Sequence, residues 1–202
     1  MLNCLLALGT GAIVGIVAAV IAVILIVVVI SWWIKTHNLF VALKNKAEEA
    51  WATIDVFLKK RFDLIPNLVE TVKGYAKHES ETLRSVIEAR NVGISAKDPQ
   101  SAIAAANAMS TSLQTFFQAV SEEYPQLQAN ANFLDLQNQL KSLEAELESA
   151  RRYYNGAVKQ FNTKREQFPD SIVVKRMGSE YDKKEYFEIT NPLERENVKV
   201  SF

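Results

Sequence analysis

The first 34 residues carry no charged side chain, because no Asp, Glu, Lys or Arg precedes Lys35. The run from Leu5 to Ile34 reads LLALGTGAIVGIVAAVIAVILIVVVISWWI, and about 20 apolar residues suffice to span the hydrocarbon core of a bilayer. A cleavable signal peptide would have a basic start and a shorter apolar core. We therefore expect residues 1–34 to form a short outer N-terminus and a retained, single-pass transmembrane helix.

The end of the apolar run indicates its orientation. Trp32 and Trp33 stand at that end, and Lys35 follows them. Indole rings settle at the headgroup level of a bilayer, and Lys and Arg are enriched in cytoplasmic loops. We interpret these three residues as interface anchors. Lys44 and Lys46 follow Lys35, and no Lys or Arg precedes the span, which predicts an N-terminus outside and the bulk of the chain in the cytoplasm.

Small residues recur within the span at a spacing of about four positions. They are Gly11, Gly15, Ala18, Ala19 and Ala22. Small residues at this spacing let two helices approach closely in lipid. The pattern predicts a homo-oligomer, although Gly and Ala are also common in membrane helices that do not pair.

Past Lys35 the apolar residues recur with a helical period. The stripe from Phe40 to Ala76 advances by about 3.6 residues a step, which is the α-helical period. It predicts a long helix continuous with the span, kinked at Pro66 and ending near His78. Shorter helices are expected over residues 80–92, with Ser80 as N-cap, and over residues 100–122.

A fourth helix is expected over residues 130–168, capped by Asn130 or Asn132. Its stripe from Phe133 to Phe161 advances by about 3.5 residues, the coiled-coil period. Such stripes can be buried only against one another, so the predicted class is all-α. Residues 35–168 would form a cytoplasmic antiparallel four-helix bundle. Periodicity is lost after Pro169, and residues 169–202 are expected to be a mostly irregular, partly packed tail near the membrane surface.

Composition argues against several classes of function. The single Cys excludes a disulfide within the chain, and with one Cys and only two His a metal site is not expected. Lys plus Arg equals Asp plus Glu at 23 each, so the basic excess of a nucleic-acid binder is missing. No nucleophile elbow, phosphate-binding glycine loop or H-E-x-x-H motif occurs. We expect no enzyme activity, no cofactor, no metal and no nucleic-acid partner.

Two carboxylates on the first long helix are candidates for chemistry. Asp63 and Glu70 flank Pro66 at a spacing that places them on one helix face. They could serve acid–base work or bind a cation. Simple solvation, or pairing with Arg61 and Lys73, is the plainer interpretation.

Two further features could contact partners. Lys59, Lys60 and Arg61 form a basic cluster that could meet anionic lipid or an acidic partner. Trp51 could be a binding anchor, but core packing is the simpler interpretation.

The run from His37 to Ser80 resembles the signature of the LemA family of bacterial membrane proteins. Its DLIPNLV segment is highly specific, and shorter matches continue to the approach to Pro169. Phe57 departs from the pattern, because the family usually has Gln there. The signature residues are Trp51, Asp55, Arg61, Asp63, Pro66, Asn67, Glu70, Gly74 and Tyr75.

The resemblance implies a location and a range of functions. It implies the bacterial cytoplasmic (inner) membrane and no catalytic activity. A branch of the family in magnetotactic bacteria is implicated in forming internal membranes. By that analogy the expected function is a non-enzymatic, membrane-anchored helical scaffold that self-associates and organises or shapes the lipid bilayer. The alternative is an adaptor or signalling module that presents the bundle to a cytosolic partner or a membrane protease.

Overall fold

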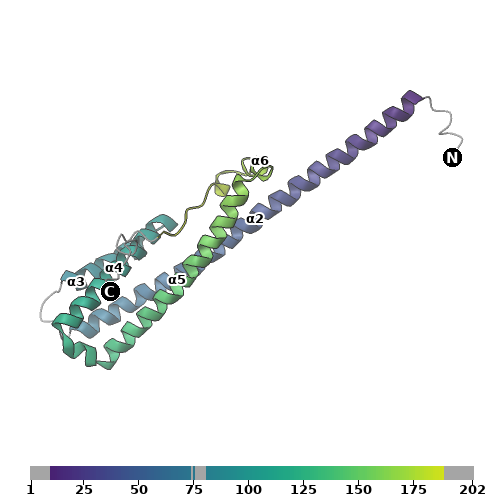
Figure 1. Ribbon diagram of the computed structural model, residues 1–202. Coiled ribbons are helices and arrows are strands. Elements are labelled where there is room, and N and C mark those ends of the chain that lie inside the picture. Colours follow the sequence, from purple (N-terminus) through teal and green to yellow (C-terminus); the bar gives the residue numbers. More distant parts are fainter. Residues whose placement is uncertain (1–9, 74, 76–80, 189–202) are drawn as a thin grey trace, which may run out of the picture. The chain divides into compact units, whose positions relative to one another are not determined.

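The regular elements of the chain are all helical among the residues that the computed structural model describes, which are 10–73, 75 and 81–188 (Figure 1). The predicted all-α class is therefore confirmed. The elements in chain order are α2 (Thr10–Lys73), α3 (Glu81–Ser95), α4 (Pro99–Glu123), the 3-10 helix η1 (Pro125–Ala129), α5 (Ala131–Glu166), α6 (Asp170–Val174) and the 3-10 helix η2 (Ser179–Tyr181).

Helix α2 is a single helix of 64 residues, as the unbroken apolar pattern predicts. It continues through Pro66, whose missing N–H removes one backbone hydrogen bond without ending the helix. The predicted helix end near His78, the Ser80 cap and Gly74 lie outside the described residues.

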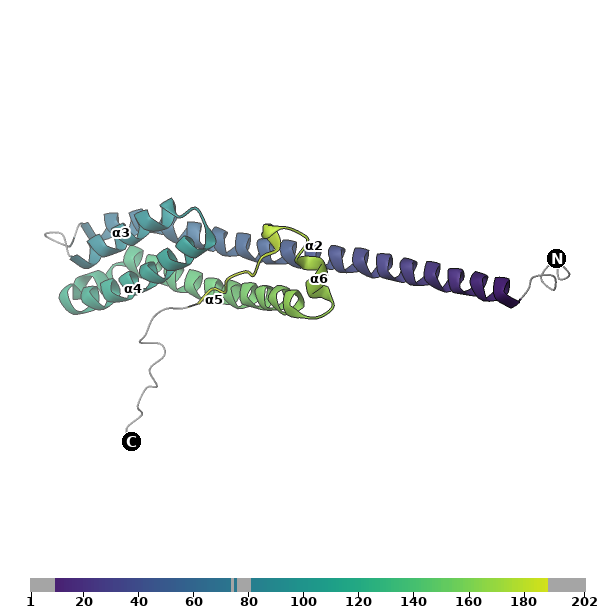
Figure 2. The same ribbon diagram turned by 90° about the horizontal axis from the view of Figure 1, so that it is seen from above.

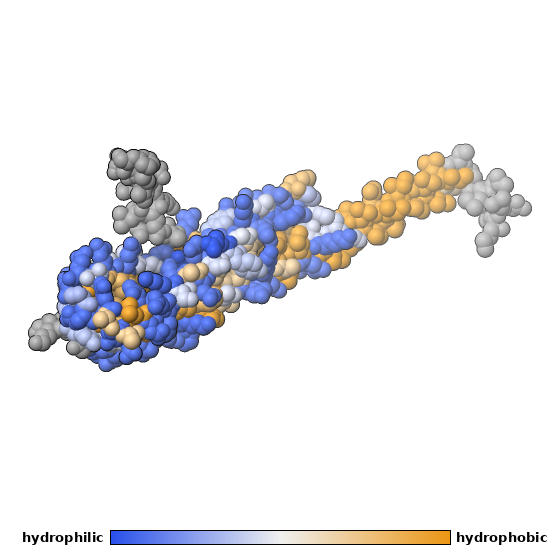
Figure 3. Space-filling model, turned by 60° about the horizontal axis from the view of Figure 1, so that its bottom comes forward, coloured by the Kyte–Doolittle hydropathy of each residue, from blue (hydrophilic) through white to orange (hydrophobic). Residues whose placement is uncertain are grey.

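The chain divides into two compact units, to which both α2 and α5 contribute. The first unit comprises residues 1–45 and 161–183. Its small core consists of Phe40, Phe161, Val174 and Tyr181. The apolar part of α2 stays uncovered, with Val14 67% and Val28 57% exposed (Figure 3). This segment is long and apolar enough to cross a membrane, which suggests a membrane anchor.

The second unit comprises residues 46–160 and 184–202. In it α3 and α4 lie against each other, and α4 lies beside α5 (Figure 2). Side-chain contacts between α2 and α5 run in opposite directions along the two helices, so these helices are antiparallel. The contacting pairs are Lys46 with Gln160, Trp51 with Tyr154, Arg61 with Glu144 and Tyr75 with Asn130.

The two units are defined by packing, whereas the boundary predicted at residue 34 rests on the expected change of solvent and the one at residue 168 on the loss of helical periodicity. The units and the predicted segments therefore differ. Residues 35–45 and 161–168 pack with the first unit. Whether residue 34 marks the edge of the bilayer stays a prediction.

Helix α3 is longer than expected. The loop predicted to begin at Gly93 begins only after Ser95. Glycine is favoured at position 93 by packing, because a Cβ there would stand 2.2 Å from Cζ of the Phe62 ring. Helix α4 starts behind a capping box in which Asp98 accepts from the backbone N–H of Ser101 at 2.9 Å.

Helix α5 begins where predicted, and Asn130 rather than Asn132 caps it by accepting from the N–H of Phe133 at 3.1 Å. The apolar stripe of α5, which has a period of 3.5 residues, is buried within the chain's own fold. The buried members are Phe133, Leu136, Leu140, Leu147, Ala150, Tyr154, Ala157 and Phe161. The stripe therefore offers no free coiled-coil seam to a second copy.

The tail is more ordered at its start than the loss of periodicity suggests. Helix α6 and η2 follow α5 directly, and the β-branched pair Val173 and Val174 is buried. Further along, Phe187 is 3% exposed within the core of the second unit. Residues 189–202, including the final Val-Lys-Val-Ser-Phe, lie outside the described residues.

Candidate functional site

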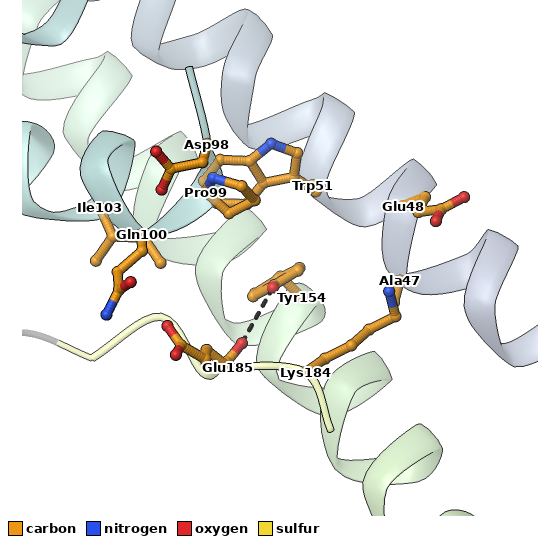
Figure 4. A pocket seen from close by; sticks show the side chains of 10 residues that line it. All are labelled: Ala47, Glu48, Trp51, Asp98, Pro99, Gln100, Ile103, Tyr154, Lys184 and Glu185. Atoms are coloured by element: carbon orange, nitrogen blue, oxygen red, sulfur yellow. Dashed lines mark hydrogen bonds between the residues drawn. The ribbon is translucent and has the colours of Figure 1, made fainter. Parts of the chain in front are cut away.

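An aromatic groove lies in the second unit between α2, the start of α4, α5 and the tail. Trp51 forms one wall, with its ring centroid 5.6 Å from that of Tyr154 and 6.4 Å from that of Phe187. The groove has a volume of about 430 Å³ (Figure 4). Its lining residues are Ala47, Glu48, Trp51, Asp98, Pro99, Gln100, Ile103, Tyr154, Lys184 and Glu185.

Trp51 shows the core packing that was the simpler of its two predicted roles, and its role as a binding anchor stays a prediction. It packs against the core, yet it is only partly buried and faces an open groove. A partly buried indole beside polar side chains is a common anchor for a ligand or peptide.

Two ionisable groups of the groove, Asp98 and Tyr154, have shifted pKa values. The N–H of Ser101 donates to Asp98, and this backbone hydrogen bond holds the pKa of Asp98 below its usual value. Burial raises the pKa of Tyr154, and the nearby charge of Glu185 raises it by a smaller amount. The Tyr154 hydroxyl donates to the Glu185 carbonyl at 3.0 Å. At neutral pH these groups are a carboxylate and a phenol, which suits binding better than proton transfer.

A cluster of charged side chains lies next to the groove, within the bundle. Arg61, only 4% exposed, forms an ion pair with Glu144 at 2.8 Å and donates to Ser110 Oγ at 3.0 Å. Arg151 lies 3.8 Å from Glu144 on the other side and 4.4 Å over the Phe187 ring. Desolvation lowers the pKa of Arg61, Glu144 raises it, and Arg151 lowers it further.

This burial corrects two sequence interpretations. Arg61 pairs with Glu144 instead of Asp63, and the basic cluster on the surface is reduced to Lys59 and Lys60. Lys59 pairs with Asp63 at 3.5 Å. The predicted partner of Glu70 is correct, since Lys73 Nζ lies 2.7 Å away.

Other signature residues form an exposed stripe on α2. Asp55, Asp63, Pro66, Asn67 and Glu70 are all exposed, and their spacing puts them on one side of the helix. Core packing does not require these side chains. This side is therefore a candidate contact surface, on which Asp63 and Glu70 pair with lysines.

Tyr75 and Phe57 both contact residues outside the exposed stripe. The Tyr75 hydroxyl accepts a hydrogen bond from the Asn130 side chain at 2.9 Å, which ties the end of α2 to the cap of α5. Phe57, the departure from the family pattern, packs partly against the core and carries Lys60 Nζ 5.5 Å over its ring. It lines a second groove with Leu64 and Leu143, so the larger side chain does add a contact surface.

The membrane-related residues lie in the first unit. A Cβ added at Gly11 or Gly15 would meet nothing within 4 Å. Trp32 and Trp33 pack edge to face with ring centroids 6.4 Å apart. The predicted self-association residues Ala18, Ala19 and Ala22 are exposed, as is the predicted anchor Lys35.

Sequence reasoning missed the residues that come from α5 and the tail. Glu144 and Arg151 are seven residues apart and so share a helix face; this spacing along the edge of an apolar stripe was the available signal. The role of Phe187 depends on long-range packing and left no local signal, whereas Asp98 directly before Pro99 had the local signal of a helix N-cap. Among the described residues, no group of three or more His, Cys, Asp or Glu side chains is placed to hold a metal ion.

The comparison with known families agrees with the resemblance. The model of the LemA family matches residues 50–202, which is most of the chain. The match includes the exposed stripe, the buried charged cluster and the aromatic groove apart from Ala47 and Glu48, and it begins after the apolar span. A search of curated proteins found no match.

Proposed function

The chain belongs to the LemA family, and from that premise we propose that it is a non-enzymatic, membrane-anchored scaffold whose copies associate through the apolar part of α2. The site of action is the bacterial cytoplasmic membrane, with the N-terminus outside and the bundle in the cytoplasm. The assembly organises or shapes the bilayer around it. The order Trp32, Trp33, Lys35 at the end of the span supports this orientation.

The uncovered small-residue face of α2 carries the proposal. Gly11 and Gly15 have open space where a side chain would stand. Such a face gains van der Waals contact when a second helix approaches its backbone. The seam of α5 is buried in its own chain, so the span is the better surface for assembly.

The non-enzymatic part of the proposal is supported by the chemistry of the grooves. The ionisable groups at Trp51 are a stabilised carboxylate and a buried phenol. The carboxylates of the α2 stripe are exposed and lie near lysines. The pKa of Asp98 lies below its usual value and that of Tyr154 above it, so neither is moved towards neutral pH in the way that general acid–base catalysis uses.

Self-association can be tested with full-length protein in liposomes. Donor- and acceptor-labelled copies should show energy transfer that persists as lipid is added in excess. Gly15→Ile should weaken association about tenfold, since the branched side chain separates the helices. Ile16→Leu, on the adjacent face, is the matched control and should leave the transfer unchanged. Transfer that falls to the level of random proximity for the parent protein would refute self-association.

The exposed stripe on α2 favours an adaptor as the second candidate. It is not needed for the core, and a groove of about 290 Å³ lies beside it, lined partly by Asp55, Lys59 and Asp63. An adaptor should capture a specific protein from native membranes. Lys59→Glu combined with Lys60→Glu should abolish that capture while the energy transfer between copies persists. Equal capture by parent and variant would remove this candidate surface.

A further inference from the structure

The corner between α5 and α6 exposes an unusual amount of apolar surface. Phe168 is 82% exposed, the highest value among the large hydrophobic residues described, and Ile172 is 43% exposed. The opposite face of α6 is covered, since Val173 and Val174 are buried. The corner thus has one face in the core of the first unit and one apolar face that is exposed.

Polar contacts fasten this corner beside the end of the apolar span. The Thr36 hydroxyl donates to Asp170 Oδ1 at 3.3 Å, and Lys164 Nζ lies 3.2 Å from Asp170 Oδ2. The Arg176 guanidinium lies 5.6 Å from the centroid of the Trp33 ring. Figure 1 shows α6 beside α2 at the end of α5. Both halves of these contacts belong to the first unit.

These contacts determine the depth of the corner relative to the span. Thr36 is three residues past Trp33, or about 4.5 Å along the helix. Phe168 and Ile172 each lie two residues from Asp170, which places them within about 7 Å of it along the backbone. Because indoles settle at the headgroup level, Phe168 and Ile172 lie at the depth of the membrane interface.

The charges of the corner fit an anionic surface. Lys175 and Arg176 are exposed and form no ion pair with a described carboxylate. The acidic neighbours are neutralised: Asp170 by Lys164, Glu166 by Lys183 and Asp182 by Arg165. Lysine and arginine beside an apolar surface are the usual elements of binding to anionic lipid.

We propose that the α5–α6 corner is a second membrane contact that seats the first unit on the bilayer. Phe168 and Ile172 insert among the headgroups and upper acyl chains, and Lys175 and Arg176 bind phosphates of anionic phospholipids. The occupant is the lipid of the membrane that α2 crosses, because the corner is held beside the end of the span. This inference rests on the membrane anchor of the proposed function but not on self-association.

The test uses full-length protein with Cys4→Ser, spin-labelled at single cysteines and reconstituted in phosphatidylcholine nanodiscs with or without phosphatidylglycerol. The informative variants are Phe168→Cys and Ile172→Cys. Val23→Cys reports on the span, and Leu134→Cys is the control for an exposed apolar position at the other end of α5. Power saturation compares the access of oxygen, which partitions into lipid, with that of a water-soluble nickel complex.

Phe168→Cys and Ile172→Cys labels should show several-fold lower nickel access than the Leu134→Cys label, and more oxygen access. Phosphatidylglycerol should lower nickel access further. The pair Lys175→Gln and Arg176→Gln should reverse that gain, since each cation near an anionic surface changes the distribution about fivefold.

Several outcomes would overturn the inference. One is a corner label as exposed to nickel as Leu134→Cys while Val23→Cys is in lipid. Another is protection that is the same with and without phosphatidylglycerol. A third is protection that appears in detergent and grows with protein concentration, because a second copy would then cover the corner. A nickel-accessible Val23→Cys label would instead refute the membrane anchor itself.

Discussion

Arg61 Nη1 lies 2.8 Å from Glu144 Oε2, and this ion pair joins α2 to α5 inside the second unit. The Arg61 side chain is 5% exposed, whereas that of Glu144 is 39% exposed. The arginine therefore depends on the glutamate for compensation of its charge, while water reaches the glutamate. Removing the glutamate is therefore costly, because the buried charge of the arginine is then left without its partner.

Glu144→Gln should destabilise the bundle by about 2–4 kcal/mol, less than for a fully buried pair because water can reach the site. Thermal unfolding of the full-length protein in detergent, followed by circular dichroism, would measure the change. Glu148→Gln is the matched control on the same helix, since Glu148 forms an exposed pair with Arg152, and it should cost about 0–1 kcal/mol. Equal effects of the two changes would contradict the dependence of Arg61 on Glu144.

Two glycine substitutions should have opposite effects on stability, because Gly93 lies against the Phe62 ring and Gly156 has open space around it. Gly93→Ala would place a Cβ 2.2 Å from Phe62 Cζ, and overpacking of a core costs about 1–3 kcal/mol. Gly156→Ala in α5 meets nothing within 4 Å and should stabilise by up to about 1 kcal/mol through helix propensity.

The same unfolding measurement would detect both glycine changes. Phe62→Leu should relieve part of the Gly93→Ala cost, so a double-mutant cycle should show a coupling energy. Additive effects in that cycle would mean that the ring moves aside without cost.

Asn155 clamps the tail onto α5. Its side chain accepts from the Phe187 N–H at 2.8 Å and donates to the Phe187 carbonyl at 3.0 Å. Asn155→Ala should speed amide exchange at Phe187 by about tenfold or more, because each lost hydrogen bond is worth about 0.5–1.5 kcal/mol. Hydrogen–deuterium exchange with mass spectrometry would measure it. Tyr153→Phe, at the exposed position two residues earlier, should leave exchange at Phe187 unchanged; acceleration there too would contradict a specific clamp.

Tyr154 predicts a pH dependence at the alkaline end. Burial raises its pKa above the ordinary value of 10.0, so the folded state holds this proton more tightly than the unfolded state does. The resulting stabilisation is complete below pH 10 and is lost as the pH rises from there through the raised pKa.

Absorbance titration of the phenols would detect this late proton. The chain has six Tyr, and Tyr154→Phe should remove the step at the highest pH, whereas Tyr153→Phe, the control at the neighbouring position, should leave that step in place. Alkaline destabilisation should be smaller in Tyr154→Phe. A last step that persists in that variant would assign the raised pKa to another residue.

Much of the helical arrangement could be predicted because it depends on local signals. The charge-free start, the period from Phe40 to Val72 and the Tyr124-Pro125 stop each act over one element, and the structure agrees with them. The boundary at Gly93 was wrong because a glycine indicates a loop only when no neighbour needs the space, and that neighbour is distant in sequence.

The candidate sites divide in the same way. The sequence by itself determined that a long apolar helix continues into a bundle, because period and charge are properties of one segment. It also supplied Trp51 and the α2 stripe by resemblance. Only the tertiary structure decided that Arg61 is a buried partner of Glu144 and that the α5 seam is used internally. It alone brought Phe168 and Ile172 beside the end of the span, because which elements meet depends on how all the apolar stripes are buried together.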